Sequence, residues 1–193
     1  ITLIFWFLAL KAIAYPIGVL TVFVLFFFRD PERSSPPGDR NILSPADGKI
    51  LEVKRIDDSD NPLGGPAVKV SIFMSIFNVH VNRVPLNGVV EKIEYHPGKF
   101  FSANLDKASL ENERNIVTLS AGDSKRIVVT QIAGLIARRI VCNISEGDSV
   151  TAGNRFGLIR FGSRLELLLP PESSVSVEKG DRTRAGVTVI ARL

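Results

Sequence analysis

The amino-acid sequence predicts a mainly β protein, a compact β-barrel or sandwich of the barrel-sandwich kind, with a hydrophobic helical membrane anchor at its N-terminus. Three observations lead to this fold class. Residues 1–28 are almost wholly apolar, residues 29–41 are rich in proline and charge, and the remaining chain alternates short β-branched runs with turn residues. Helical periodicity is scarce after residue 41, which argues against alternating helices and strands.

The apolar segment, residues 1–28, is long enough to cross a membrane, which takes about 20 apolar residues. Lys11 and Pro16 divide it into halves that are each too short to cross as a straight helix. Two arrangements are open: a single kinked span, or two short helices lying in one leaflet. A signal peptide fits less well because no small-residue cleavage site follows. A buried core helix is also less favoured, because a small domain would have to cover many Phe and Leu side chains. The sequence begins at Ile1, so we expect a methionine upstream.

Residues 29–41 combine prolines, a glycine and charges of both signs, which is typical of a linker, so residues 42–193 are expected to form the folded domain. Pairs such as Asp-Gly, Asn-Gly and Gly-Gly mark turns within it. The strands expected between the turns are 49–53, 67–73, 89–95, 115–119, 126–132, 140–144, 155–161, 165–169 and 187–193. Short helical turns are expected within 103–110 and 134–139.

The amino-acid composition limits the classes of function that are possible. The 193 residues are 45% hydrophobic and 23% charged, which fits one folded domain rather than a disordered chain. The formal charge of +4 suits an anionic membrane surface. Nucleic acid is an unlikely ligand because the basic residues are dispersed and not interleaved with aromatic ones. The single cysteine, Cys142, excludes an internal disulfide and a multi-cysteine metal site. Acid–base chemistry near neutral pH has only His80 and His96 to draw on.

Several short motifs follow the linker, and the most informative is a Gly162-Ser163 pair between two expected strands. Alone, this pair would be read as a turn. The blocks that precede it are Ser44-Pro-Ala-Asp47-Gly48, Phe73-Met-Ser-Ile-Phe-Asn-Val-His80-Val-Asn82-Arg83, Tyr95-His-Pro-Gly98, Glu111-Asn-Glu-Arg-Asn115 and Gln131-Ile-Ala-Gly134-Leu-Ile-Ala-Arg138-Arg139. In this order, from about Phe27 to Leu193, they resemble the short form of the phosphatidylserine decarboxylase family. Phe161-Gly162-Ser163-Arg164 is similar to the cleavage motif of its short members.

The resemblance implies a proenzyme that cuts itself between Gly162 and Ser163, giving a 1–162 β chain and a 163–193 α chain that stay together as a heterodimer. Glycine before the serine leaves the attacked carbonyl open and permits strained dihedrals. Ser163 would become a covalent pyruvoyl group, so the family implies neither a metal nor pyridoxal phosphate. The implied reaction converts phosphatidylserine to phosphatidylethanolamine and CO2 through a Schiff base between pyruvoyl and the substrate amine. The implied location is the cell membrane, with the catalytic domain in the cytoplasm.

The resemblance also suggests roles for individual residues. His80 is the candidate proton donor to the substrate, and Asp47 is a candidate to orient or charge-couple a histidine, as in serine-based triads. Longer family members carry a second histidine, the apparent cleavage base, where this chain has Arg83. His80 would then serve both steps. Arg83, Arg138 and Arg139 are candidates for binding the lipid phosphate or the substrate carboxylate, with a solvated basic face as the alternative.

Three alternatives stay open. The first is a pyruvoyl decarboxylase of a soluble amino acid, which the apolar N-terminus disfavours. The second is a decarboxylase of another serine-headgroup lipid, the ether lipid archaetidylserine. The third is a degenerate, uncleaved, membrane-tethered β binding domain. Chain integrity separates the third from the others, because a binding domain stays in one piece.

Overall fold

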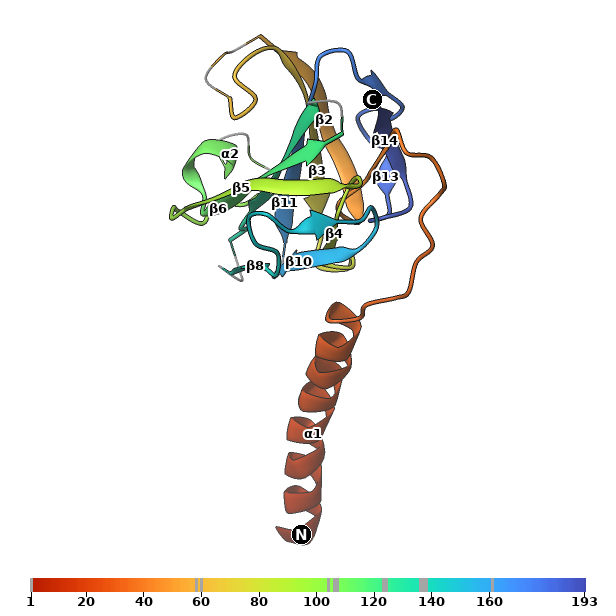
Figure 1. The fold of residues 1–193 in the computed structure, drawn as a ribbon. Coiled ribbons are helices and arrows are strands. Elements are labelled where there is room, and N and C mark those ends of the chain that lie inside the picture. The colour runs from red at the N-terminus through yellow and green to blue at the C-terminus, as the bar shows by residue number, and fades with distance from the viewer. Residues whose placement is uncertain are drawn as a thin grey trace. The chain divides into compact units, whose positions relative to one another are not determined.

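The computed structural model describes residues 2–57, 59, 61–103, 105, 108–122, 125–135, 139–160 and 162–193, and only the backbone of residues 2–9. The chain divides into two compact units, a helical one ending at Pro31 and a β-rich one running from Glu32 to Leu193. The prediction of a mainly β protein with an apolar N-terminal helix is therefore confirmed (Figure 1).

The N-terminal unit holds one α-helix, α1 (Thr2–Phe27), which continues through Pro16. The structure thus has one helix in this segment rather than two short ones. Proline removes one backbone hydrogen bond but does not have to end an apolar helix. The 26 residues of α1 extend about 39 Å at the usual rise of an α-helix. The stretch Leu10–Phe27 has a mean hydropathy of 2.1 and is only 6% buried, so it is long and apolar enough to span a membrane.

The second unit is built from short antiparallel strands and one described short helix, α2. In chain order they are β1 (Asn41–Leu43), β2 (Gly48–Ile56), β3 (Ala67–Met74), β4 (Val81–Arg83), β5 (Gly88–His96), α2 (Ala108–Glu111), β6 (Arg114–Ala121), β7 (Lys125–Ile132), β8 (Ile140–Cys142), β9 (Ser149–Val150), β10 (Arg155–Ile159), β11 (Ser163–Leu169), β12 (Ser174–Val175), β13 (Arg182–Thr183) and β14 (Val189–Arg192).

Most strands belong to a curled eight-stranded sheet with the order β13-β2-β3-β11-β7-β6-β5-β9. Two three-stranded sheets, β1-β14-β12 and β4-β10-β8, complete the unit. β11 comes late in the sequence yet lies between β3 and β7. Likewise β14 pairs with β1, and β13 pairs with β2. The C-terminal segment therefore contributes strands to two of the three sheets.

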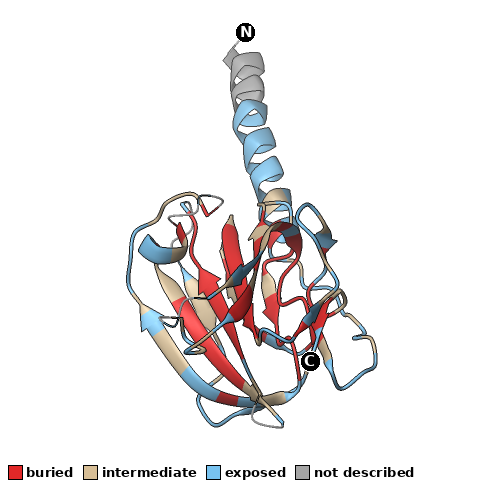
Figure 2. Ribbon diagram, turned by 90° about the horizontal axis from the view of Figure 1, so that it is seen from above, coloured by how far each residue is buried: buried red, intermediate tan, exposed pale blue. Residues whose placement is uncertain are grey.

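β11 separates two environments, because successive side chains on a strand point to opposite faces. Leu165, Leu167 and Leu169 belong to the main hydrophobic core, and Ser163 shares their face. Arg164, Glu166 and Leu168 alternate with them. Leu168 belongs to a second, smaller cluster with Ile116 and Val128. Figure 2 shows the buried residues gathered along the central strands, whereas most of the described part of α1 is exposed.

The differences from the expected elements have simple causes. β1, β4, β9, β12 and β13 were not expected, because two- or three-residue strands show no hydrophobic alternation. Helix was expected within 103–110 and is found at α2. In the expected turn at 134–139, Gly134, Leu135 and Arg139 are not helical, and residues 136–138 lie outside the described part.

Gly48 at the start of β2 offers a test of the packing. A Cβ at this position would lie 2.2 Å from the carbonyl oxygen of Phe73 in β3. Gly48→Ala is therefore expected to lower the free energy of unfolding by roughly 1–3 kcal/mol, the usual cost of overpacking. Denaturant unfolding of the full chain in detergent measures this. Gly65→Ala is the matched control because nothing lies within 4 Å of its Cβ position. An equal loss of stability in both variants would contradict the explanation.

Candidate active site

The Gly162–Ser163 bond lies at the start of β11. Ser163 is fully buried, and its Oγ has no hydrogen-bond partner among the described residues. A buried unsatisfied polar atom costs about 1–3 kcal/mol, so it calls for a functional explanation. Gly162 has φ +68°, a left-handed conformation that glycine adopts far more easily than other residues. No atom lies within 4 Å of its Cβ position, so conformation rather than crowding favours glycine here.

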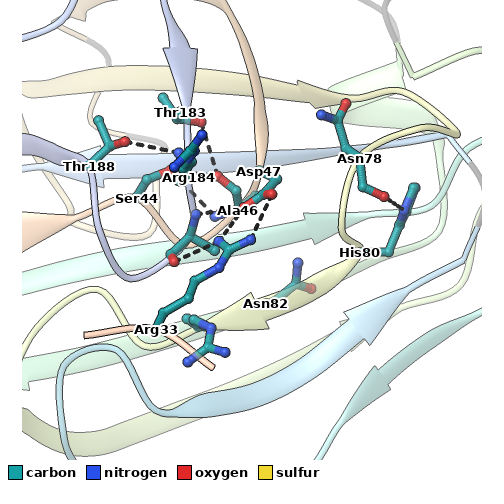
Figure 3. Close-up of polar contacts among 12 residues, drawn as sticks. Arg33, Ser44, Ala46, Asp47, Asn78, His80, Asn82, Thr183, Arg184 and Thr188 are labelled. Atoms are coloured by element: carbon teal, nitrogen blue, oxygen red, sulfur yellow. Dashed lines mark hydrogen bonds and ion pairs between the residues drawn. The ribbon is translucent and has the colours of Figure 1, made fainter. Parts of the chain in front are cut away.

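His80, between β3 and β4, lies next to this bond and is only 3% exposed. The backbone N–H of Gly162 donates to its Nε2 at 3.3 Å, and its Nδ1 lies 3.0 Å from the carbonyl oxygen of Asn78 (Figure 3). A carbonyl oxygen can only accept, so Nδ1 carries the proton and Nε2 presents a lone pair. The neutral histidine is therefore oriented with its basic nitrogen toward the backbone N–H of Gly162, one residue before Ser163.

A tight turn fixes the carbonyl that orients His80. Asn78 Oδ1 accepts from the backbone N–H of Ser75 at 2.9 Å and from Ser75 Oγ at 2.8 Å. The backbone N–H of Asn78 donates to the carbonyl of Ser75 at 2.9 Å. Residues 75–78 thus form a closed turn after β3. The sequence analysis missed Asn78 as a functional residue. Its role became visible only in the structure, where its carbonyl orients the ring of His80.

Asp47 is 8% exposed and is paired with Arg33, a residue of the segment between α1 and β1. Both nitrogens of the Arg33 fork bind the carboxylate, with Nη2 and Oδ2 2.8 Å apart. Arg33 Nη1 also donates to the carbonyl of Ala185, whose backbone N–H donates to Asp47 Oδ1 at 2.8 Å. Figure 3 shows Asp47 held in this way, with His80 beside Asn78. The coupling of Asp47 to a histidine stays a prediction.

The turn that carries Asp47 is fixed from two sides. Ser44 Oγ donates to the carbonyl of Ala46 at 2.7 Å, and Thr183 Oγ1 donates to the same carbonyl at 3.0 Å. Thr183 comes from β13 in the C-terminal segment. The Ser-Pro-Ala-Asp-Gly motif is thus a tightly bonded turn that joins the two ends of the β-rich unit.

The three candidate arginines differ in position. Arg83 ends β4, is 4% exposed and donates from Nη1 to the carbonyl of Gly153 at 2.8 Å, so it does not lie on a solvated face. Arg139 is exposed just before β8. Arg138 lies outside the described residues. Substrate binding by these arginines stays a prediction. His96, at the end of β5, pairs in register with Arg114.

A chain of buried amides also leads toward Ser163, and the sequence analysis did not find it. Asn115 Nδ2 donates to Gln131 Oε1 at 3.0 Å, and Gln131 Nε2 donates to Asn82 Oδ1 at 2.8 Å. Asn82 Nδ2 then faces the sulfur of Met74 at 3.9 Å. Met74 is the cross-strand partner of Ser163. Polar residues at inward positions of strands gave no periodic signal, so only the register reveals the chain.

The described residues hold no group of three or more His, Cys, Asp or Glu side chains that could bind a metal ion. The described polar groups near the Gly162–Ser163 bond include the ring of His80 and the chain of side-chain amides that ends at Met74. This set is suited to moving a proton and holding a carbonyl.

Comparison with known proteins is consistent with this site. The family model described as phosphatidylserine decarboxylase matches residues 20–191. A phosphatidylserine decarboxylase proenzyme of Syntrophus aciditrophicus is 55% identical over 166 residues, covering 86% of this chain and 78% of that protein. Proteins of the same name from Saccharopolyspora erythraea and Magnetococcus marinus are 52% and 47% identical, covering 91% and 94% of this chain and 75% and 83% of their own lengths. The chain therefore belongs to the phosphatidylserine decarboxylase family of carboxy-lyases.

Proposed function

We propose that this chain decarboxylates phosphatidylserine to phosphatidylethanolamine and CO2, using a pyruvoyl group that it forms from its own Ser163. The observation that carries the proposal is the arrangement at one bond. The buried hydroxyl of Ser163, which has no hydrogen-bond partner in the described part of the chain, follows a left-handed Gly162, whose amide lies 3.3 Å from the basic nitrogen of His80. The relatives, named as proenzymes that act on phosphatidylserine, support the substrate and the need for processing.

The first part of the proposed mechanism cuts the chain. Ser163 Oγ gives its proton to His80 Nε2 and attacks the carbonyl carbon of Gly162, so that an ester replaces the amide and the nitrogen of Ser163 becomes a free amine. A base then removes the Cα proton of Ser163, and the Gly162 carboxylate leaves from Cβ. The enamine left at residue 163 tautomerises to an imine. Water hydrolyses this imine to a ketone and ammonia, which balances the reaction.

A pyruvoyl group fits this position. The buried, unpartnered Ser163 Oγ is the atom that would be eliminated, and the open space at Gly162 leaves room for its carbonyl to be attacked. Such a group supplies an electrophilic carbonyl that joins the substrate amine and accepts electrons as CO2 departs. His80 is suited to return a proton to the substrate carbon, because its Nδ1 is held by Asn78 and its Nε2 lies 3.3 Å from the backbone nitrogen of Gly162, next to residue 163.

We propose that the 1–162 and 163–193 fragments stay associated as a heterodimer after the cut. β11 would remain hydrogen-bonded between β3 and β7, and β13 and β14 would remain on β2 and β1. Cleavage therefore removes a connection but not the strand pairing that holds the C-terminal segment.

We also propose that residues 1–28 anchor the protein to the cell membrane, with residues 29–41 as the connection to the catalytic domain on the cytoplasmic side. The length and apolar surface of α1 support the anchor. The connection is bonded to the domain by Arg33 on Asp47 and by Glu32 on Arg155. The Arg155 guanidinium lowers the pKa of the Glu32 carboxyl below its usual range, so that this contact carries full opposite charges at neutral pH.

The decisive experiment is the intact mass of the purified wild-type chain beside Ser163→Ala. The wild type is expected to give two fragments that meet at Gly162–Ser163, the smaller one lacking a free amine. Ser163→Ala is expected to stay whole, and only the wild type should release CO2 from phosphatidylserine in mixed micelles. Thr188→Ala, which removes a hydroxyl that accepts from the backbone N–H of Arg184, serves as a control for hydroxyl loss. A wild-type chain that stays whole would refute the proposal.

A further inference from the structure

The reactive bond lies at one end of the eight-stranded sheet, where a row of paired residues crosses six strands. The row consists of the pairs Lys49–Phe73 (β2 and β3), Met74–Ser163 (β3 and β11), Arg164–Ile132 (β11 and β7), Ile132–Arg114 (β7 and β6) and Arg114–His96 (β6 and β5). Because neighbouring strands are antiparallel, the segments that follow β3, β5 and β7 and those that precede β2, β6 and β11 all emerge at this end. We call it the serine end of the sheet.

Hydrogen bonds join these segments to one another around the reactive bond. The buried Asn112 donates from Nδ2 to the carbonyls of Phe101 and Ala133, each at 2.8 Å. It thus links the segment after β5 to the segment after β7. The backbone N–H of Arg160 donates to the carbonyl of Arg139 at 3.3 Å, which links the segment before β11 to the segment after β7 as well. The loops at the serine end therefore form a connected surface.

Exposed apolar side chains are concentrated on this surface. The exposed large apolar and aromatic side chains among the described residues of the β-rich unit are Phe77, Val89, Tyr95, Leu105, Leu110 and Leu135. Only Val89 lies at the opposite end of the sheet, near the start of β5. Phe77 and Leu135, which follow the two strands that flank β11, are 64% and 55% exposed. Single exposed apolar residues are ordinary, whereas their concentration in one region marks an interaction surface. We call Phe77, Leu105, Leu110 and Leu135 the apolar rim.

A phospholipid substrate gives this concentration a physical reason. The acyl chains of a phospholipid stay in the bilayer because their exposure to water is unfavourable. The headgroup must then reach the buried Ser163 while its lipid remains in the membrane, so the segments around Ser163 have to face the bilayer. Apolar side chains in such segments gain from leaving water, and amphipathic segments bury theirs about 5–10 Å into the interface. A protein bound over the rim would instead cover the approach to Ser163.

We propose that the apolar rim is a second membrane contact of this chain, in which Phe77 and Leu135 enter the interface of a phospholipid bilayer on either side of β11. The contact presupposes the lipid substrate of the proposed function and adds the surface through which the β-rich unit meets that lipid. It differs from anchoring by α1, because α1 attaches the chain to the membrane whereas the rim determines which face of the catalytic domain is turned toward it.

Tryptophan substitutions measure which side chains enter the bilayer. Trp6 in α1 is the only tryptophan of the sequence, so Trp6→Phe combined with Ser163→Ala gives a full-length, uncut chain without tryptophan. Phe77→Trp and Leu135→Trp are introduced into it one at a time, and Val89→Trp, at a residue that is 43% exposed, is the matched control. Each chain is reconstituted into phosphatidylcholine vesicles with and without bromine atoms in the acyl chains, which quench an indole inside the bilayer. Because α1 is present in every chain, attachment to the vesicles is the same and only the position of the indole differs.

The indoles of Phe77→Trp and Leu135→Trp are expected to show a blue-shifted emission and a loss of fluorescence in brominated vesicles. The indole of Val89→Trp is expected to escape bromine and to be quenched by aqueous iodide. The proposal is overturned if either rim indole is quenched by bromine no more than the control. Shielding of the rim indoles from iodide without quenching by bromine would indicate a protein partner or a second copy of the chain, and would overturn it too. Thermal unfolding checks that the three chains keep the fold. Because Ser163 is replaced in all of them, the result is independent of whether Ser163 forms a pyruvoyl group.

Discussion

Replacing His80 with glutamine is expected to leave the purified chain almost entirely uncut. Glutamine keeps a polar side chain of similar reach but has no basic nitrogen to take the proton from Ser163 Oγ. Loss of a general base slows a reaction by about 10²- to 10⁴-fold. The geometry behind the expectation is the neutral ring of His80, with Nδ1 on the Asn78 carbonyl and Nε2 at 3.3 Å from the amide of Gly162.

The rate is measured by the appearance of the small fragment in a mass-resolved time course after cell-free synthesis. His96→Gln is the matched control, since His96 is the other histidine and lies at the end of β5, away from β11 in the strand order. Thermal unfolding of both variants shows whether the fold is kept. Normal cleavage in a folded His80→Gln chain would remove His80 from the proposed mechanism and direct attention to other groups near Gly162.

Removing either partner of the Asp47–Arg33 pair is expected to destabilise the β-rich unit by about 3–5 kcal/mol, the usual cost of leaving one buried charge without its partner. The side chains of Arg33 and Asp47 are only 10% and 12% exposed, so water screens the pair little. Arg33→Met and Asp47→Asn should therefore lower the unfolding midpoint alike. The double variant should lose less stability than the sum of the two single losses, because it leaves no buried charge without a partner. Denaturant unfolding in detergent measures the three values, each in a Ser163→Ala background so that all chains are uncut.

The same variants decide what Asp47 does. If Asp47 is only a structural partner of Arg33, cleavage should slow equally in Arg33→Met and Asp47→Asn. If it acts through a histidine, Asp47→Asn should slow cleavage far more than Arg33→Met at equal stability. Arg155→Met is the control for loss of an arginine from the same region. Its pair with Glu32 is exposed, and exposed pairs contribute only about 0–1 kcal/mol.

The sequence was sufficient for the features that depend on local pattern. Alternating β-branched residues predicted the long strands such as β3 and β7. The motifs around the Gly-Ser pair predicted the family, to which the chain belongs. The role of His80 as proton donor came from the family resemblance and stays a prediction, and the structure adds that His80 lies beside Gly162. The register between β3 and β11 supplies the spatial reason, because it brings the end of β3 to the start of β11.

The features that sequence reasoning did not predict all depend on contacts between distant segments. Nothing in the linker composition indicated that Arg33 would bind Asp47, because a proline-rich charged segment is expected to be exposed to solvent. In the sequence, Arg164 was interpreted only as a variant position of the cleavage motif, whereas the structure places it in the wall of a cavity. The amides of Asn82 and Gln131 are in strands of two different sheets, and only the packing of these sheets brings them to 2.8 Å. Side-chain pairing across sheets is fixed by the tertiary fold, which local periodicity does not encode.

The central place of β11 has a consequence for the life of the processed protein. Before the proposed cut, refolding from a denatured state is a first-order process, since every strand is tethered to every other. Afterwards β11 to β14 would belong to a separate short polypeptide, and renaturation would become second order, governed by the dilution of the two pieces. A mature molecule that unfolds in dilute solution would thus be slow to re-form. Its persistence would depend on how slowly the ladder opens rather than on how readily it re-forms.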